Sequence, residues 1–191
     1  MILAPTISSD AIVGATREWL EKAVIGLNLC PFAKAVHVRG QIRYAVSDAR
    51  NEAELLADLK VELQALIAAS PEQVDTTLLI HPDVLKDFAD YNAFLTLAEA
   101  ALDEAGLVGV VQLATFHPRY QFAGTAPEDI GNYTNRSPYP MLHLLREASV
   151  SRAVRAFPDA GAIYETNIAT MEKLGRAGWV RLGLNSTENG N

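Results

Sequence analysis

Apolar residues recur at helical spacing in three long segments of the first half of the chain. The first segment begins near Asp10, which can cap a helix, and ends at Pro31. The second runs from about Asn51 to Ala69, and the third runs from about Asp83 to Ala105 and stops at Gly106. Each pattern predicts a helix with one buried face and one solvent-exposed face.

Short β-rich runs separate these helices. Residues 41–47 alternate apolar and polar side chains, which predicts a half-buried strand. Thr76–Ile80 is an apolar run between two prolines, which predicts a central strand buried on both faces. Residues 107–116 form a third such run. Because a single helix connects each strand to the next, we expect right-handed crossovers and a largely parallel sheet.

The last third of the chain begins with a long loop and is otherwise predicted to be mainly helical. Pro140 suits the first turn of a helix that continues from Met141. Another helix is expected after Pro158, with Gly175 as its stop, and residues 179–184 could form an edge strand. The resulting fold class is α/β: a small, largely parallel sheet of three to four strands flanked by helices, with a long functional loop before a helical C-terminal part.

Composition fits one globular domain over residues 1–191, with an ordered core at 10–184 and a frayed tail at 185–191. A net charge of −7 disfavours a nucleic-acid partner, because phosphate binding draws on clustered Lys and Arg. The N-terminus lacks the features of a signal peptide, and no apolar run approaches the roughly 20 residues of a membrane span. One cysteine excludes an internal disulfide, so we expect a reducing, cytoplasmic location.

Residues 115–147 are unusually rich in His, Arg, Tyr and Asn. Long loops in compact domains are usually binding or catalytic loops, so this segment is where we expect the chemistry. No motif within it specifies a reaction.

Two predicted strands end in the same dipeptide, at His81-Pro82 and His117-Pro118. If the strands are parallel neighbours, about 5 Å apart or about 10 Å apart with one strand between them, both imidazoles emerge at one carboxyl edge of the sheet. Open α/β sheets bind ligands at that edge. The alternative is that each histidine bonds a nearby carbonyl and caps a strand end. A functional role is favoured for His117, because the long loop follows it directly.

His143 lies on the helix predicted after Pro140. There it shares a face with Arg146 and Glu147, at the i+3 and i+4 positions. The Glu147 carboxylate could fix the tautomer of the imidazole and raise its basicity, which would make the pair catalytic. A solvated pair of side chains is the alternative.

Arginine and aromatic side chains near His117 are candidates for substrate binding. Arg119 and Arg136 could grip a carboxylate or phosphate with two parallel hydrogen bonds, or form surface ion pairs. Arg136 should also lie near the N-terminus of the helix predicted at Pro140, where an anion is favoured. Tyr120 and Tyr139 could line a pocket or cover the core, and Asn135 could contact substrate or shape a turn.

Cys30 follows a helix rather than a strand, unlike a thioredoxin-type cysteine. It is either a buried small apolar residue or a weak candidate for a haem-iron or redox ligand. The chain has no zinc-binding spacing, no glycine-rich phosphate loop and no Gly-x-Ser-x-Gly elbow. A structural zinc site, nucleotide hydrolysis and serine esterase chemistry are therefore disfavoured.

Three segments, residues 27–34, 115–124 and 135–147, resemble the signature blocks of a bacterial family, domain of unknown function 1415. The resemblance covers about residues 11–184 and implies a stand-alone cytosolic bacterial domain, without an assigned activity to transfer. A fainter likeness, in the Cys-Pro-Phe-Ala block and a late His/Arg-rich block, is to haem-dependent amino-acid N-hydroxylases of the YcgG type.

The leading hypothesis is an enzyme that acts on a small anionic metabolite at the carboxyl edge of the sheet. His117 would be an iron ligand or a general acid/base, and Arg119 and Arg136 would orient the substrate. A haem-dependent oxygenase is its most concrete version. The contrasting hypothesis is a non-catalytic binding or assembly module that uses the 117–147 loop. An apolar pocket with convergent His, Arg and Tyr favours catalysis, and a flat exposed patch favours assembly.

Overall fold

Helices and strands alternate through most of the chain. The structure is a computed structural model that describes residues 7–156 and 162–184. The elements in chain order are α1 (Ser9–Trp19), η1 (Leu20–Ile25), α2 (Ala33–Val38), β1 (Ile42–Val46), α3 (Glu52–Ala68), β2 (Thr76–Ile80), α4 (Phe88–Glu104), β3 (Val111–Phe116), η2 (Ile130–Asn135), β4 (Met141–Arg146), α5 (Glu147–Ala156) and α6 (Ile163–Arg181).

The strands form one sheet in the order β1-β2-β4-β3. β1 and β2 are parallel, but β4 runs antiparallel to both of its neighbours, so the predicted largely parallel sheet is wrong. The segment Met141–Arg146 is a strand and not the helix predicted after Pro140. A short apolar run fits a buried strand and a helical turn equally well, and here pairing on both sides decides for the strand. The predicted central strand is confirmed, because every residue of β2 is buried.

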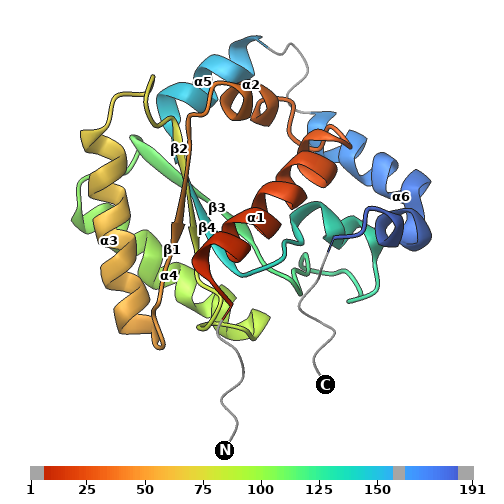
Figure 1. The fold of residues 1–191 in the computed structure, drawn as a ribbon, viewed down its shortest axis with the longest axis horizontal. Coiled ribbons are helices and arrows are strands. Elements are labelled where there is room, and N and C mark those ends of the chain that lie inside the picture. Colours follow the sequence, from red (N-terminus) through yellow and green to blue (C-terminus); the bar gives the residue numbers. More distant parts are fainter. Residues whose placement is uncertain (1–6, 157–161, 185–191) are drawn as a thin grey trace, which may run out of the picture.

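The two faces of the sheet are covered by different helices, as Figure 1 shows. α3 and α4 pack on one face, where Leu59, Phe94 and Leu142 belong to one buried cluster. α1 and η1 pack on the other, where Trp19, Ile80 and Met141 belong to a second cluster. Successive strand residues point to opposite faces, so β4 sends Leu142 and Leu144 into the first cluster and Met141 into the second.

Local capping sets where the helices begin. The side chains of Ser8, Asn51 and Asp87 accept hydrogen bonds from backbone N–H groups in the first turns of α1, α3 and α4. α4 therefore begins five residues later than the predicted Asp83. Leu85 adopts φ 56°, a left-handed conformation that cannot belong to a helix.

Two predictions for the C-terminal part have different outcomes. Gly175 interrupts α6 with φ 62°, so the predicted stop is a kink inside one element. The edge strand predicted at 179–184 is wrong, because α6 continues to Arg181. Pro158 and the tail at 185–191 lie outside the described residues. Among the helices that the structure describes, none is long and apolar enough to cross a membrane.

Candidate functional site

His81 and His117 lie at the same edge of the sheet. Met141 of β4 pairs with Ile80 on one side and with Phe116 on the other, so the histidines that follow these residues flank β4. The ring of Tyr91 contacts both imidazoles, with centroid distances of 5.8 Å to His81 and 5.1 Å to His117. The expected arrangement with one intervening strand is confirmed.

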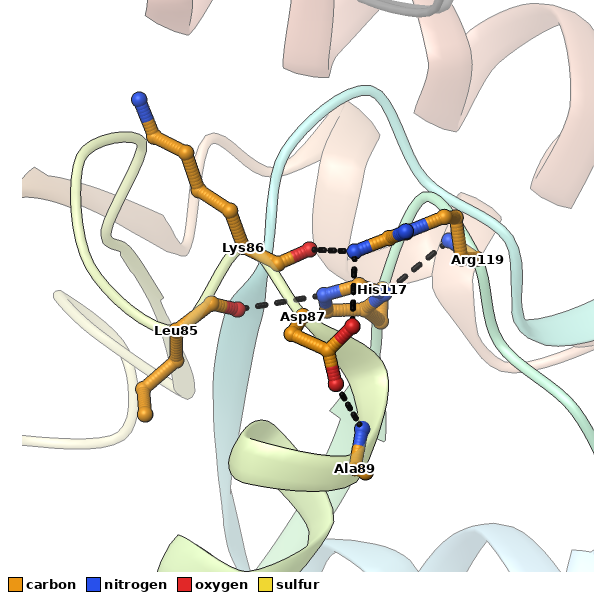
Figure 2. Close-up of polar contacts among 6 residues, drawn as sticks. All are labelled: Leu85, Lys86, Asp87, Ala89, His117 and Arg119. Atoms are coloured by element: carbon orange, nitrogen blue, oxygen red, sulfur yellow. Dashed lines mark hydrogen bonds and ion pairs between the residues drawn. The ribbon is translucent and has the colours of Figure 1, made fainter.

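The ring nitrogens of His117 both contact the protein backbone (Figure 2). Nε2–H donates to the Leu85 carbonyl at 3.1 Å, and Nδ1 accepts from the Arg119 N–H at 3.0 Å. This pattern fixes the neutral tautomer, and burial lowers the pKa of His117 to about 4. Because both ring nitrogens are engaged, His117 has no free lone pair for iron or for a substrate proton in this conformation.

Arg119 also connects the loop after β3 to the loop before α4. Its guanidinium donates to the Lys86 carbonyl at 2.7 Å and to the Asp87 carboxylate at 3.2 Å. Asp87 in turn accepts a hydrogen bond from the Ala89 N–H at the start of α4. Figure 2 shows that His117 and Arg119 together hold the loop after β3 against the loop before α4. His117 and Arg119 therefore position these two loops.

His81 forms a hydrogen bond within the turn that follows β2. Its Nδ1–H donates to the Val84 carbonyl at 3.1 Å, which is the strand-capping alternative. Nε2 is buried and has no hydrogen-bond partner within the described part of the chain. Burial lowers the pKa of His81 to about 4, so the ring is neutral near pH 7.

Arg136 is held by the loop itself. Its guanidinium donates to the carbonyls of Tyr120 and Pro127 and lies 4.2 Å from the ring centroid of Tyr133. The helix N-terminus predicted beside it is absent, because Met141 begins a strand. The predicted convergence of positive potential at Arg136 is therefore wrong.

The remaining loop candidates also contact the protein. Asn135 donates from its amide to the Thr115 carbonyl at 3.1 Å, and Tyr120 accepts from the Thr115 hydroxyl at 3.3 Å. Tyr139 is buried in the cluster under α1 and is 7% exposed. These side chains shape the loop.

A large cavity lies elsewhere, on the sheet face that α1 and η1 also cover. Its volume is about 600 Å³. Its floor is formed by side chains from all four strands, including Ile42, Leu78, Ala114 and His143. Side chains of η1, α2 and α5 form the walls. The cavity therefore lies over a face of the sheet, and it does not coincide with the carboxyl-edge site that the strand-His-Pro pattern predicts.

His143 is the histidine that lines this cavity. The Thr76 hydroxyl donates its single proton to the Leu144 carbonyl at 2.7 Å. The same oxygen lies 2.6 Å from Nε2 of His143, so Nε2–H is the donor in that contact and Nδ1 carries the lone pair. Nδ1 has no hydrogen-bond partner among the described residues. Burial lowers the pKa of His143 to about 4, which keeps the imidazole neutral near pH 7.

The predicted helical pairing of His143 with Arg146 and Glu147 is wrong. In a strand, residues three apart lie on opposite faces, and Arg146 donates to carbonyls at the end of α3, including that of Ala69 at 2.7 Å. Glu147 begins α5, and its backbone N–H donates to the Val110 carbonyl at 2.9 Å. The residue that orients His143 is Thr76, which the sequence pattern did not identify.

The mouth of the cavity lies between α2 and α5, whose neighbouring positions are visible at the top of Figure 1. The cavity-lining residues that are exposed all belong to these two helices or their ends: Ala35, Arg39, Arg152 and Ala156. Arg152 donates to the Ser149 hydroxyl at 2.9 Å, and that hydroxyl donates to the Asp75 carboxylate. Two arginines thus mark the entrance.

Cys30 forms part of the wall. Burial raises the pKa of its thiol, so the thiol stays protonated near pH 7. It therefore packs as a small apolar side chain, which was one of the two alternatives. The signal that could have located the cavity is the set of small residues on facing elements, such as Ala33, Ala114 and Ala153.

Residues 11–181 match the family model described as "Protein of unknown function (DUF1415)". No curated protein and no solved structure matches the chain. The likeness to haem-dependent N-hydroxylases finds no support in these comparisons. The match covers most of the chain, which therefore belongs to the DUF1415 family.

Proposed function

We propose that this chain is an enzyme that acts on a small anionic metabolite in the α2–α5 cavity, with His143 as its general base. The observation that carries the proposal is the free lone pair on Nδ1 of a neutral, oriented imidazole inside a largely apolar cavity. Apolar pockets of about 300–1,000 Å³ with a few placed polar groups are the usual form of a small-molecule site.

The surroundings of His143 suit transfer of a proton from a bound molecule. The Thr76 oxygen accepts from Nε2–H and holds the ring in one orientation. Once Nδ1 takes a proton, the same oxygen still accepts from the imidazolium. A pKa of about 4 makes the empty-site imidazole a weak base, and a bound anion raises that pKa because it stabilises the charged form. Substrate charge therefore activates the base.

A metal-dependent or haem-dependent enzyme fits the described residues less well. His117, the predicted iron ligand, has both nitrogens engaged. Within residues 7–156 and 162–184, no three His, Cys, Asp or Glu side chains are grouped to hold a metal ion. The acid/base role therefore moves from His117 to His143, and Arg119 and Arg136 are replaced by Arg39 and Arg152 as candidates for anion binding.

Hydrogen exchange tests the base without knowledge of the full reaction. Protein in D₂O is incubated with a panel of short 2-oxo and 3-oxo carboxylates, whose carbon-bound protons exchange through a base. We expect NMR to show faster loss of the proton signal for at least one acid, and the acceleration should disappear in His143→Gln. His37→Gln, a histidine outside the cavity, should behave as wild type.

The same panel is followed by ¹⁵N spectra of the His143 ring. A bound anion should shift the Nδ1 resonance and raise the pKa of His143. If no acid shifts this resonance and none exchanges faster than in buffer, the proposed function is wrong.

A further inference from the structure

We infer that the ligand is an amphipathic monoanion, with its anionic group between Arg39 and Arg152 and an unbranched apolar body that passes His143. This inference rests on the proposed function and names the substrate class of the same site. Three features carry it: the position of the arginines, the chemistry of the walls and the depth of the cavity.

Two arginines, Arg39 and Arg152, lie at the entrance, whereas Arg146 lines the cavity from β4 and donates to carbonyls near the end of α3. Arg39 follows the last residue of α2, and Arg152 lies on α5, and both are exposed while lining the cavity. The Arg39 guanidinium has no hydrogen-bond or ion-pair partner among the described residues, although its backbone N–H donates to the Ala35 carbonyl. Arg152 reaches the Asp75 carboxylate only through the Ser149 hydroxyl. The cavity-lining residues include three arginines and one carboxylate, Asp75, so their charge favours an anion.

The interior offers little to a second charged group. Beyond the mouth, the walls and the floor are made mainly by apolar side chains, among them Leu20, Val24, Phe32 and Leu145. The polar side chains on the floor are those of Thr76, Gln112, His143 and Arg146, and both the Thr76 hydroxyl and the Arg146 guanidinium already donate to backbone carbonyls. Burying a second charge there without a partner of opposite charge is unfavourable. A dicarboxylate or a sugar phosphate therefore fits the cavity poorly.

The depth sets the length of the apolar body. On the floor, Gln112 lies at the start of β3, on the side of α5, and Phe116 lies at the inner end beside Trp19. These two residues are four apart in a strand, which corresponds to about 13 Å. An extended chain advances about 3.6 Å for every three backbone bonds, so about 11 bonds fit this depth. Ala114, midway between them, pairs with His143 and leaves room beside its ring.

Arginine binds carboxylate and phosphate groups alike, so the structure does not distinguish the two head groups. The experiment therefore compares a ligand of each kind. Binding of decanoate, decyl phosphate, decan-1-ol and succinate is measured by calorimetry, below the concentrations at which the amphiphiles form micelles. The ¹⁵N resonance of His143 Nδ1 is followed in the same titrations. We expect decanoate to bind and shift Nδ1, with decanol and succinate at least about tenfold weaker. Tighter binding of decyl phosphate would assign the head group as phosphate and support the same inference.

Three variants locate the ligand. The double variant Arg39→Gln/Arg152→Gln should weaken decanoate binding about tenfold, because each exposed ion pair contributes only modestly to affinity. Arg155→Gln removes an exposed arginine of α5 that does not line the cavity, and it should leave affinity unchanged. Ala114→Leu fills the floor and should abolish decanoate binding, with an unchanged circular dichroism spectrum as the check on folding.

Each outcome bears on a different claim. Equal binding of decanol and decanoate, or an equal loss in Arg155→Gln, would overturn the position of the anion at the mouth. If decanoate fails to bind while a short oxo acid shifts His143, the inference is wrong and the proposed function stands. If neither class of ligand shifts His143, both are wrong.

Discussion

At the scale of single residues, two adjacent threonines show how burial and hydrogen bonding combine. Thr76 and Thr77 are both buried in the central strand β2, at 6% and 0% exposure. Thr76 faces the cavity and its hydroxyl joins His143 to the Leu144 carbonyl. Thr77 faces the opposite cluster of leucines, and its hydroxyl has no partner among the described residues. A buried hydroxyl without a partner destabilises the fold.

Valine has nearly the shape of threonine without the hydroxyl, so the two sites give opposite predictions. Thr76→Val should lower the free energy of unfolding by about 1–2 kcal/mol, because it leaves a carbonyl and the His143 N–H unpaired. Thr77→Val should raise it by up to about 1 kcal/mol, because it removes an unpaired group. Urea denaturation measures both. A loss of stability in Thr77→Val as large as that in Thr76→Val would contradict the assigned hydrogen bonds.

The Thr76→Val variant also reports on the tautomer of His143. In the wild type, the ¹⁵N shifts of the ring should show one tautomer, with the proton on Nε2. Without the Thr76 oxygen, the ring should populate both tautomers. An unchanged tautomer would mean that a group other than Thr76 orients the base.

At the scale of elements, the identity of β4 separates what the sequence predicted from what it missed. β1, β2, β3 and the long helices follow from residue periodicity, because each pattern is local. In Met141–Arg146, four apolar residues surround His143, and the strand character of the segment comes from pairing with β2 and β3. Such non-local pairing leaves no periodic signal in a short segment. Because a helix was predicted here, His143 was paired with Arg146 and Glu147, whereas its partner in the structure is Thr76.

Two glycines in different helices provide a matched test of helix geometry. Gly14 lies inside α1 with ordinary helical φ and no atom within 4 Å of an added Cβ. Gly14→Ala should therefore stabilise the protein by about 0.5–1 kcal/mol. Gly175 adopts φ 62° at the kink of α6, so Gly175→Ala should destabilise by about 1–2 kcal/mol despite the open space around it. Thermal or urea unfolding measures both changes.

If Gly175→Ala proved neutral, α6 would be able to straighten through the kink. That result would contradict the interrupted geometry of the helix. Destabilisation by Gly14→Ala would in turn show that α1 contacts another part of the protein at that position.

At the scale of the whole molecule, three histidines have a pKa that burial lowers, although they lie in different parts of the fold. His81 and His117 mark the strand ends at the carboxyl edge, as the repeated His-Pro pattern predicted, and they hold loops in place. His143 lies on the cavity floor. The strand-His-Pro pattern drew attention to His81 and His117, and the helix predicted after Pro140 drew attention to His143. The sequence favoured His117 for function, but the role of each histidine depends on which nitrogen lone pair the rest of the fold leaves free.

The shared property predicts how stability depends on pH. Burial lowers the pKa of each of these histidines from 6.5 to about 4. Between these values the unfolded chain binds protons that the folded protein does not, so the unfolded state gains stability as pH falls. The stabilising contribution is therefore complete above about pH 6.5 and is lost as pH falls towards 4. Each histidine contributes a slope of up to about 1.4 kcal/mol per pH unit, which gives at most about 4 kcal/mol per unit for the three.

Urea denaturation at closely spaced pH values between 7.5 and 4.5 measures this slope. His143→Gln should reduce it by about one proton and leave the other two contributions in place. A short oxo acid whose carboxylate lies beside His143 should reduce it in the same way, because a nearby anion raises the pKa of the folded imidazole towards its value in the unfolded chain. Free energies of unfolding that stay constant across this range would show that the three imidazoles take up protons in the folded protein. The neutral, proton-accepting state of His143 on which the catalytic proposal depends would then be wrong.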